Sequence, residues 1–129
     1  MVLRLIPVVL LCACAAQAPL PTSERPELAQ AALPYAQPLR DVGITRVISP
    51  GNGAMVRLET LSGPVYVRYP QDVPPAAFVL DVTPDGLHAT AASFDRTRDA
   101  PVLAAVLPVA IREAATNNVV QWVRANPWN

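Results

Sequence analysis

Apolar and polar residues alternate through the middle of the chain, in the pattern of strands with one buried and one exposed face. In segment 54–61 two apolar residues alternate with Arg57 and Glu59, and the same alternation recurs in 65–69. A period of two places successive side chains on opposite faces of a strand. The pattern therefore predicts a hairpin over these two segments, preceded by a short strand at 46–48.

A second hairpin is predicted from its turn residues. Segments 78–82 and 87–92 have the composition of strands and flank the sequence Thr-Pro-Asp-Gly at 83–86. Proline presets the backbone at the first turn position, and aspartate and glycine suit the positions that follow. His88 would then lie across the hairpin from Asp81, as a surface pair.

The C-terminal third contains apolar residues at helical spacing. They recur as far as Ala114 and predict one helix that begins at Asp99, an N-cap candidate, with Pro101 in its first turn. Pro108 should kink this helix, because its ring removes a backbone hydrogen bond. The asparagines at 117–118 can take the left-handed turn that ends a helix.

Segment 119–124 has two readings. Three valines and Trp122 favour a final strand, whereas Asn118 and Gln121 would suit the capping box of a short helix. We favour the strand. The expected fold is an α+β domain over residues 41–129, with a small antiparallel sheet of four to five strands covered by one helix.

Ahead of this domain, proline interrupts any regular pattern. Residues 15–40 are rich in Ala, Pro and Gln and contain five prolines. Proline at that density favours extended polyproline II structure, which would reach roughly 80 Å over this length. We therefore expect a flexible tether over 14–40.

The first residues have the order of a secretory signal. One positive charge at Arg4 precedes an apolar run at 5–11, and small residues follow at 12–18. The apolar run is shorter than the roughly 20 residues that a membrane-spanning helix needs. Export is therefore the expected fate of the chain.

The end of this signal, Leu-Cys-Ala-Cys at 11–14, resembles the bacterial lipobox. The resemblance implies that Cys14 carries diacylglycerol, that residues 1–13 are removed, and that the new amino terminus is acylated as well, with fatty chains such as palmitate. Cysteine is required because only a thiolate is nucleophilic enough at neutral pH. Ala15 follows in place of aspartate, which implies an anchor in the outer membrane, on its periplasmic face.

The signal departs from the family pattern at two points and leaves alternatives. It has a single basic residue, and Cys12 stands where Ala, Ser or Thr is usual. Cys12 itself is the poorer candidate for lipidation, because Leu11 would stand where the family has a small residue. Ordinary cleavage after Ala18 would give a soluble periplasmic protein, but Pro19 would then follow the cut.

Composition and charge suggest no further partner. The formal net charge is zero and all ten basic residues are arginine, so the chain has no basic field for nucleic acid. Both cysteines lie in the signal region, which leaves the mature domain without a disulfide or a thiol site. Proline is the outlier, at 15 of 129 residues. We expect membrane attachment through the lipid, and no cofactor.

No motif in the sequence indicates catalysis. His88 is the single histidine, and no spacing of ligand residues matches a known metal site. The remaining catalytic possibility is a pair of carboxylates, from Glu59, Asp95, Asp99 or Glu113. It defines the alternative function, a tethered periplasmic hydrolase.

We therefore expect a noncatalytic domain that is a binding or structural component of the cell envelope. The side chains expected to contact a partner are Arg57, Arg68 and Trp128. Arg57 and Arg68 should share the outer face of the first hairpin, and Trp128 is an aromatic residue near the chain end.

Overall fold

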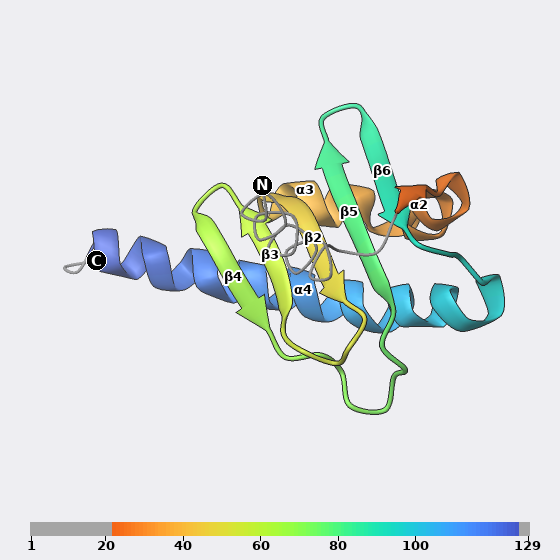
Figure 1. Ribbon diagram of the computed structural model, residues 1–129. Coiled ribbons are helices and arrows are strands. Elements are labelled where there is room, and N and C mark those ends of the chain that lie inside the picture. The colour runs from red at the N-terminus through yellow and green to blue at the C-terminus, as the bar shows by residue number, and fades with distance from the viewer. Residues whose placement is uncertain (1–21, 127–129) are drawn as a thin grey trace, which may run out of the picture.

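The computed structural model describes residues 22–126, which form one antiparallel sheet with helices on one of its faces (Figure 1). The sheet has six strands in the order β1-β6-β5-β2-β3-β4, so the predicted α+β class is confirmed with slightly more strands than expected. The strands are β1 (Ser23–Glu24), β2 (Ile44–Pro50), β3 (Val56–Thr60), β4 (Gly63–Val67), β5 (Ala77–Thr83) and β6 (Gly86–Ala91). The helices are α2 (Pro26–Ala32), the short 3-10 helix η2 (Leu33–Tyr35), α3 (Ala36–Asp41) and α4 (Arg96–Ala125).

The predicted alternation in β3 and β4 is confirmed. Val56 and Leu58 are buried, while Arg57 points to the opposite face of the sheet. The β5–β6 hairpin is confirmed as well, because Thr83 pairs with Gly86 and leaves two residues in the loop. Strand periodicity therefore identified the centre of the sheet correctly.

The expectation of a flexible tether up to residue 40 is wrong for the part of the chain that the structure describes. Residues 23–41 form β1, α2, η2 and α3, and Leu28 and Leu39 are 2% and 0% exposed. Pro26 does not prevent this, because it occupies the start of α2, where its missing N–H would have no partner in any case. The folded domain therefore begins well before Asp41.

The expected C-terminal strand is also wrong. Helix α4 runs without interruption over Arg96–Ala125, through both internal prolines and through segment 119–124. Its N-cap is Asp95, whose side chain accepts hydrogen bonds from two backbone N–H groups, so the helix begins before the predicted Asp99. Asn118 does not end the helix, because its side-chain amide donates to the carbonyl oxygen of Val42 at 3.1 Å. Valines add to an existing helix at little cost, since propagation is easier than nucleation.

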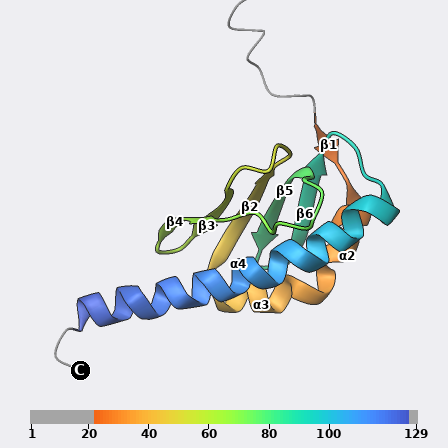
Figure 2. The same cartoon turned by 90° about the horizontal axis from the view of Figure 1, so that it is seen from below.

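The helices form one layer on one face of the sheet, and the other face is open (Figure 2). The core lies between sheet and helices and contains the inward side chains of five strands, β2 to β6, together with those of α2, α3 and α4. Its largest fully buried members are Leu28, Leu39, Ile44, Leu58, Leu80, Leu103 and Leu107. The open face and the outer side of the helix layer are the two broad surfaces left for contacts.

Candidate functional site

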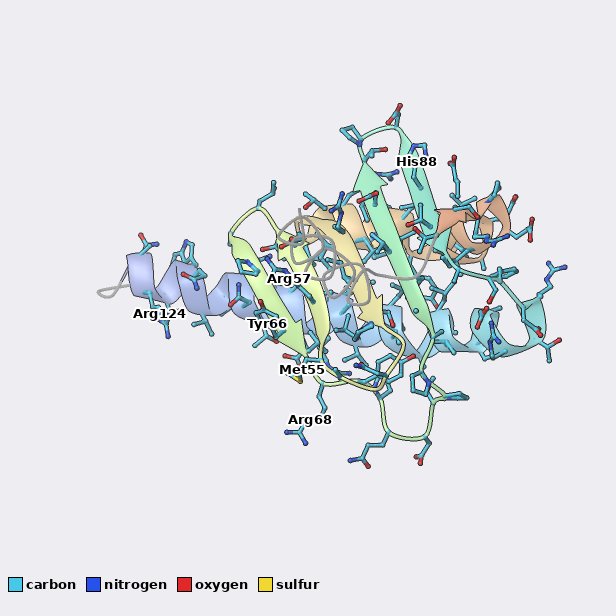
Figure 3. The ribbon with its side chains drawn as sticks, viewed as in Figure 1. Met55, Arg57, Tyr66, Arg68, His88 and Arg124 are labelled. Atoms are coloured by element: carbon cyan, nitrogen blue, oxygen red, sulfur yellow. The ribbon has the colours of Figure 1, made fainter. Side chains whose placement is uncertain are left out.

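Arg57 lies on the open face and is held by its neighbours (Figure 3). Its guanidinium donates to the Tyr66 hydroxyl at 3.0 Å and stacks over the same ring at 5.6 Å from the centroid. Its Nε lies 3.3 Å from the Glu59 carboxylate, close enough for an ion pair but without hydrogen-bond geometry. The cross-strand register explains this cluster, because Arg57 pairs directly with Tyr66. The guanidinium is therefore already engaged within the domain.

Arg68 lies apart from this cluster. Its side chain is exposed and points away from Arg57 and Tyr66 in Figure 3. Within residues 22–126, no hydrogen bond or ion pair holds it. The structure thus places Arg57 in β3 and Arg68 directly after the end of β4, without joining them. Trp128 and Cys14 lie outside the described residues.

Asp81 and His88 face each other across the β5–β6 hairpin, as the sequence predicted, but each has a different partner. Arg46 forms an ion pair with Asp81 at 2.6 Å, from the neighbouring strand β2. The His88 ring nitrogen Nδ1 lies 3.4 Å from a carboxylate oxygen of Glu24, in β1. These are half-exposed surface pairs, of the kind that contribute at most about 1 kcal/mol each.

Asp99 is the one buried carboxylate among the described residues, with 4% of its surface exposed. Arg98 donates to both of its oxygens, at 2.7 and 2.9 Å, and the backbone N–H of Asp95 donates at 2.8 Å. The Arg98 hydrogen bonds hold the pKa of Asp99 below its usual value, against the opposing effect of burial. The carboxylate is therefore charged, with a hydrogen-bond donor at each oxygen, and it holds the first turn of α4 in place.

Two hollows lie near this helix start. One of about 210 Å³ contains Asp99 and Arg98 in its wall, together with residues of the 51 and 75–78 segments. A wider one of about 530 Å³ lies between α2 and α4 and is lined by Glu27, Gln30, Ala31, Phe94 and Arg96. Each hollow has one acidic residue in its described lining, whereas a hydrolase that uses paired carboxylates needs two acidic side chains close together. Neither hollow therefore supports the alternative function of a hydrolase.

Asp99→Asn should lower the free energy of unfolding by roughly 1.5–3 kcal/mol at pH 7, because it removes a charged acceptor from three hydrogen bonds. The pKa of Asp99 in the folded chain is below its ordinary value of 3.8, so this stabilisation is present above pH 3.8 and disappears as the pH falls through the folded pKa. Urea unfolding at pH 7 and pH 3 measures it. The exposed Asp72→Asn is the control, and an equal loss at both pH values would contradict the assignment.

The outer face of α4 is an apolar surface that the rest of the described chain leaves exposed. We define it as the residues that point away from the sheet, at spacings of three and four along the helix. It consists of Pro101, Ala104, Ala105, Pro108, Arg112, Ala115, Val119, Trp122 and Val123. Arg112 is its one charged member. The opposite side of α4 is buried on the sheet, so over residues 100–111 the helix is apolar on both sides, which is typical of a helix segment covered on both sides.

The end of α4 extends beyond the edge strand β4 (Figure 1). The Asn118 contact is the last hydrogen bond from this helix to the rest of the described chain. Beyond it, Val119 is 63% exposed and Trp122 is 55% exposed. Large apolar side chains on a projecting helix are a common mark of a contact surface.

The prediction from sequence did not include this surface, because segment 119–124 was expected to form a strand. A signal was present, since apolar residues occupy both sides of a helix drawn through 100–111 and recur on its outer side at 119–123. The four valine and tryptophan side chains at 119–123 become a surface only when the helix continues to them.

No known protein family, curated protein or solved structure matches the chain. Within the described helices, none combines the length and hydropathy needed to cross a membrane. Among residues 22–126 there is also no group of three potential metal ligands.

Proposed function

We propose that this chain is an exported bacterial lipoprotein, anchored through Cys14 to the outer membrane, whose folded domain binds another protein through the outer face of α4. The lipobox-like sequence at 11–14 supports the anchor. The uncovered apolar outer face of α4 supports the binding role, and it is the observation on which the proposal rests.

Three features favour this surface over the open face of the sheet as the main contact. Its apolar side chains recur along the helix with Arg112 as the one charge among them, and its end projects where a partner can reach it. The open face instead carries charged pairs that are satisfied within the domain, such as Arg46 with Asp81. Arg57, Arg68 and Trp128 stay predicted as secondary contacts.

Photo-crosslinking in native membranes tests the proposal. A photoreactive residue at Val123 should give covalent adducts with protein, because that side chain lies in the contact surface. The same group at His88, also exposed but on the β5–β6 hairpin, is the control and should give at least tenfold less adduct. Equal yields at the two positions, or adducts with lipid alone, would contradict the binding surface.

A further inference from the structure

We infer that the occupant of the outer face of α4 is a second copy of this chain, held in an antiparallel helix pair with two-fold symmetry. This inference rests on the proposed function and names the partner of the same surface. A two-fold pair requires a surface that is complementary to itself, and the outer face meets that requirement.

The spacing of its residues is that of a helix-pairing seam. Positions 105, 108, 112, 115, 119 and 122 follow one another by three, four, three, four and three residues. A repeat of this kind keeps one stripe of the helix facing a partner helix over several turns. The opposite stripe of α4 already packs on its own sheet, so this seam is available only to another molecule.

Side-chain size changes along the seam in a way that fits antiparallel pairing. Its N-terminal end carries the small residues Ala105 and Pro108, and its C-terminal end carries Val119 and Trp122. With the two-fold axis between residues 113 and 114, Trp122 of each copy meets the partner's Ala105, and Val119 meets the partner's Pro108. Large side chains then fill the space above small ones. A parallel pair would instead place the two Trp122 side chains together and leave the small residues facing a gap.

Arg112 is the one charge in the seam and lies near its centre. In the same register it meets the partner's Ala115, which leaves room for the arginine stem to pack while the guanidinium reaches water at the edge of the helix pair. The same register brings the two Arg112 residues within about one helical turn of each other, so their like charges reduce the stability of the pair.

The short link to the proposed anchor favours contacts between copies of the chain. The chain enters the fold at β1 in the sheet layer, whereas the outer face lies on the far side of the helix layer (Figure 2). With the described fold starting at residue 22, the link from Cys14 spans at most about 30 Å. A link this short keeps anchored copies in one plane, which raises their effective concentration for each other.

The area of the seam sets the expected strength. The outer face is about 35 Å long and one helix wide, which places the interface near the small end of the range for stable pairs. We therefore expect association in the micromolar range in detergent solution, and a larger paired fraction in the membrane.

Thiol crosslinking in membranes tests the register directly. Two single variants, Pro108→Cys and Val119→Cys, are expressed in the same cells. A short thiol-to-thiol reagent should then join one copy of each into a product of twice the chain mass, because these positions face each other across the pair. Either variant alone should give at least tenfold less, since each lies far from its own equivalent in the partner. The unmodified chain controls for reaction at Cys12 or Cys14. No mixed product, or an equal product from Val119→Cys alone, would overturn the antiparallel pair.

A second measurement does not depend on the crosslinker. Trp122→Ala should weaken self-association of the detergent-solubilised full chain at least tenfold, as measured by sedimentation equilibrium. Leu61→Ala removes an apolar side chain that is 84% exposed and lies outside α4, and it should leave self-association unchanged. A monomeric chain whose Val123 photo-adducts have the mass of a different protein would overturn the pair and leave the proposed function intact. If neither the photo-adducts nor self-association were found, both the helix pair and the proposed binding function would be overturned.

Discussion

A chain shortened to begin at Asp41 should fail to fold, although sequence patterning places the start of the domain there. The truncation removes α2 and most of α3, and with them Leu28 and Leu39 from the core. Replacing one buried leucine with alanine typically costs 2–5 kcal/mol, and a whole domain is stable by only about 5–15 kcal/mol. Removing both leucines and their helices should therefore abolish cooperative unfolding in urea, and a chain that begins at Thr22 should retain it.

Point substitutions in the full chain separate this packing effect from a general effect of truncation. Leu39→Ala should lower the free energy of unfolding by about 2–5 kcal/mol, because its side chain is fully buried. Leu33→Ala, in the same segment but 56% exposed, should change it by less than about 1 kcal/mol. A cooperative transition in the Asp41 chain, or equal effects of the two substitutions, would show that α2 and α3 are not part of the folding unit.

Cys14→Ser should abolish fatty-acid labelling and release the protein from membranes. The thiol is the atom that would carry diacylglycerol, and serine is a far poorer nucleophile at neutral pH. Each buried CH₂ contributes about 0.8 kcal/mol, so two or more long chains hold a protein at the membrane and their loss removes the anchor. Metabolic labelling and fractionation measure both effects.

Cys12→Ser is the matched control, two residues away, and should leave labelling unchanged. Mass spectrometry of the mature protein gives an independent result, a chain that starts at a modified Cys14. A chain that starts at Pro19 or retains Met1, or labelling lost only with Cys12→Ser, would contradict the choice of anchor.

The position of the fold start changes what the anchor would do. The expected tether over 14–40 would hold the domain up to roughly 80 Å from the membrane. Because α2 and α3 belong to the domain, only the short link before residue 22 can serve as the tether, and its reach is at most about 30 Å. A lipidated chain of this design would stay near its membrane, where contacts between anchored copies are favoured.

The sequence by itself determined the elements whose pattern is local. Strand alternation identified β3 and β4, the turn sequence at 83–86 identified the β5–β6 hairpin, and helical spacing identified the middle of α4. In each case the signal comes from a single strand, turn or helix, since side-chain period and turn chemistry act over a few residues.

Tertiary structure decided the elements whose stability depends on distant partners. Helices α2 and α3 are too short to persist alone, and they form because Leu28 and Leu39 are buried by the sheet and α4. Segment 119–124 has strong strand propensity but continues a helix that is already nucleated and anchored by Asn118. Propensity differences of a few tenths of a kcal/mol per residue are smaller than the burial of Leu28 and Leu39, so tertiary contacts decided where the domain starts. Segment 119–124 is exposed and is helical because the packed part of α4 nucleates it.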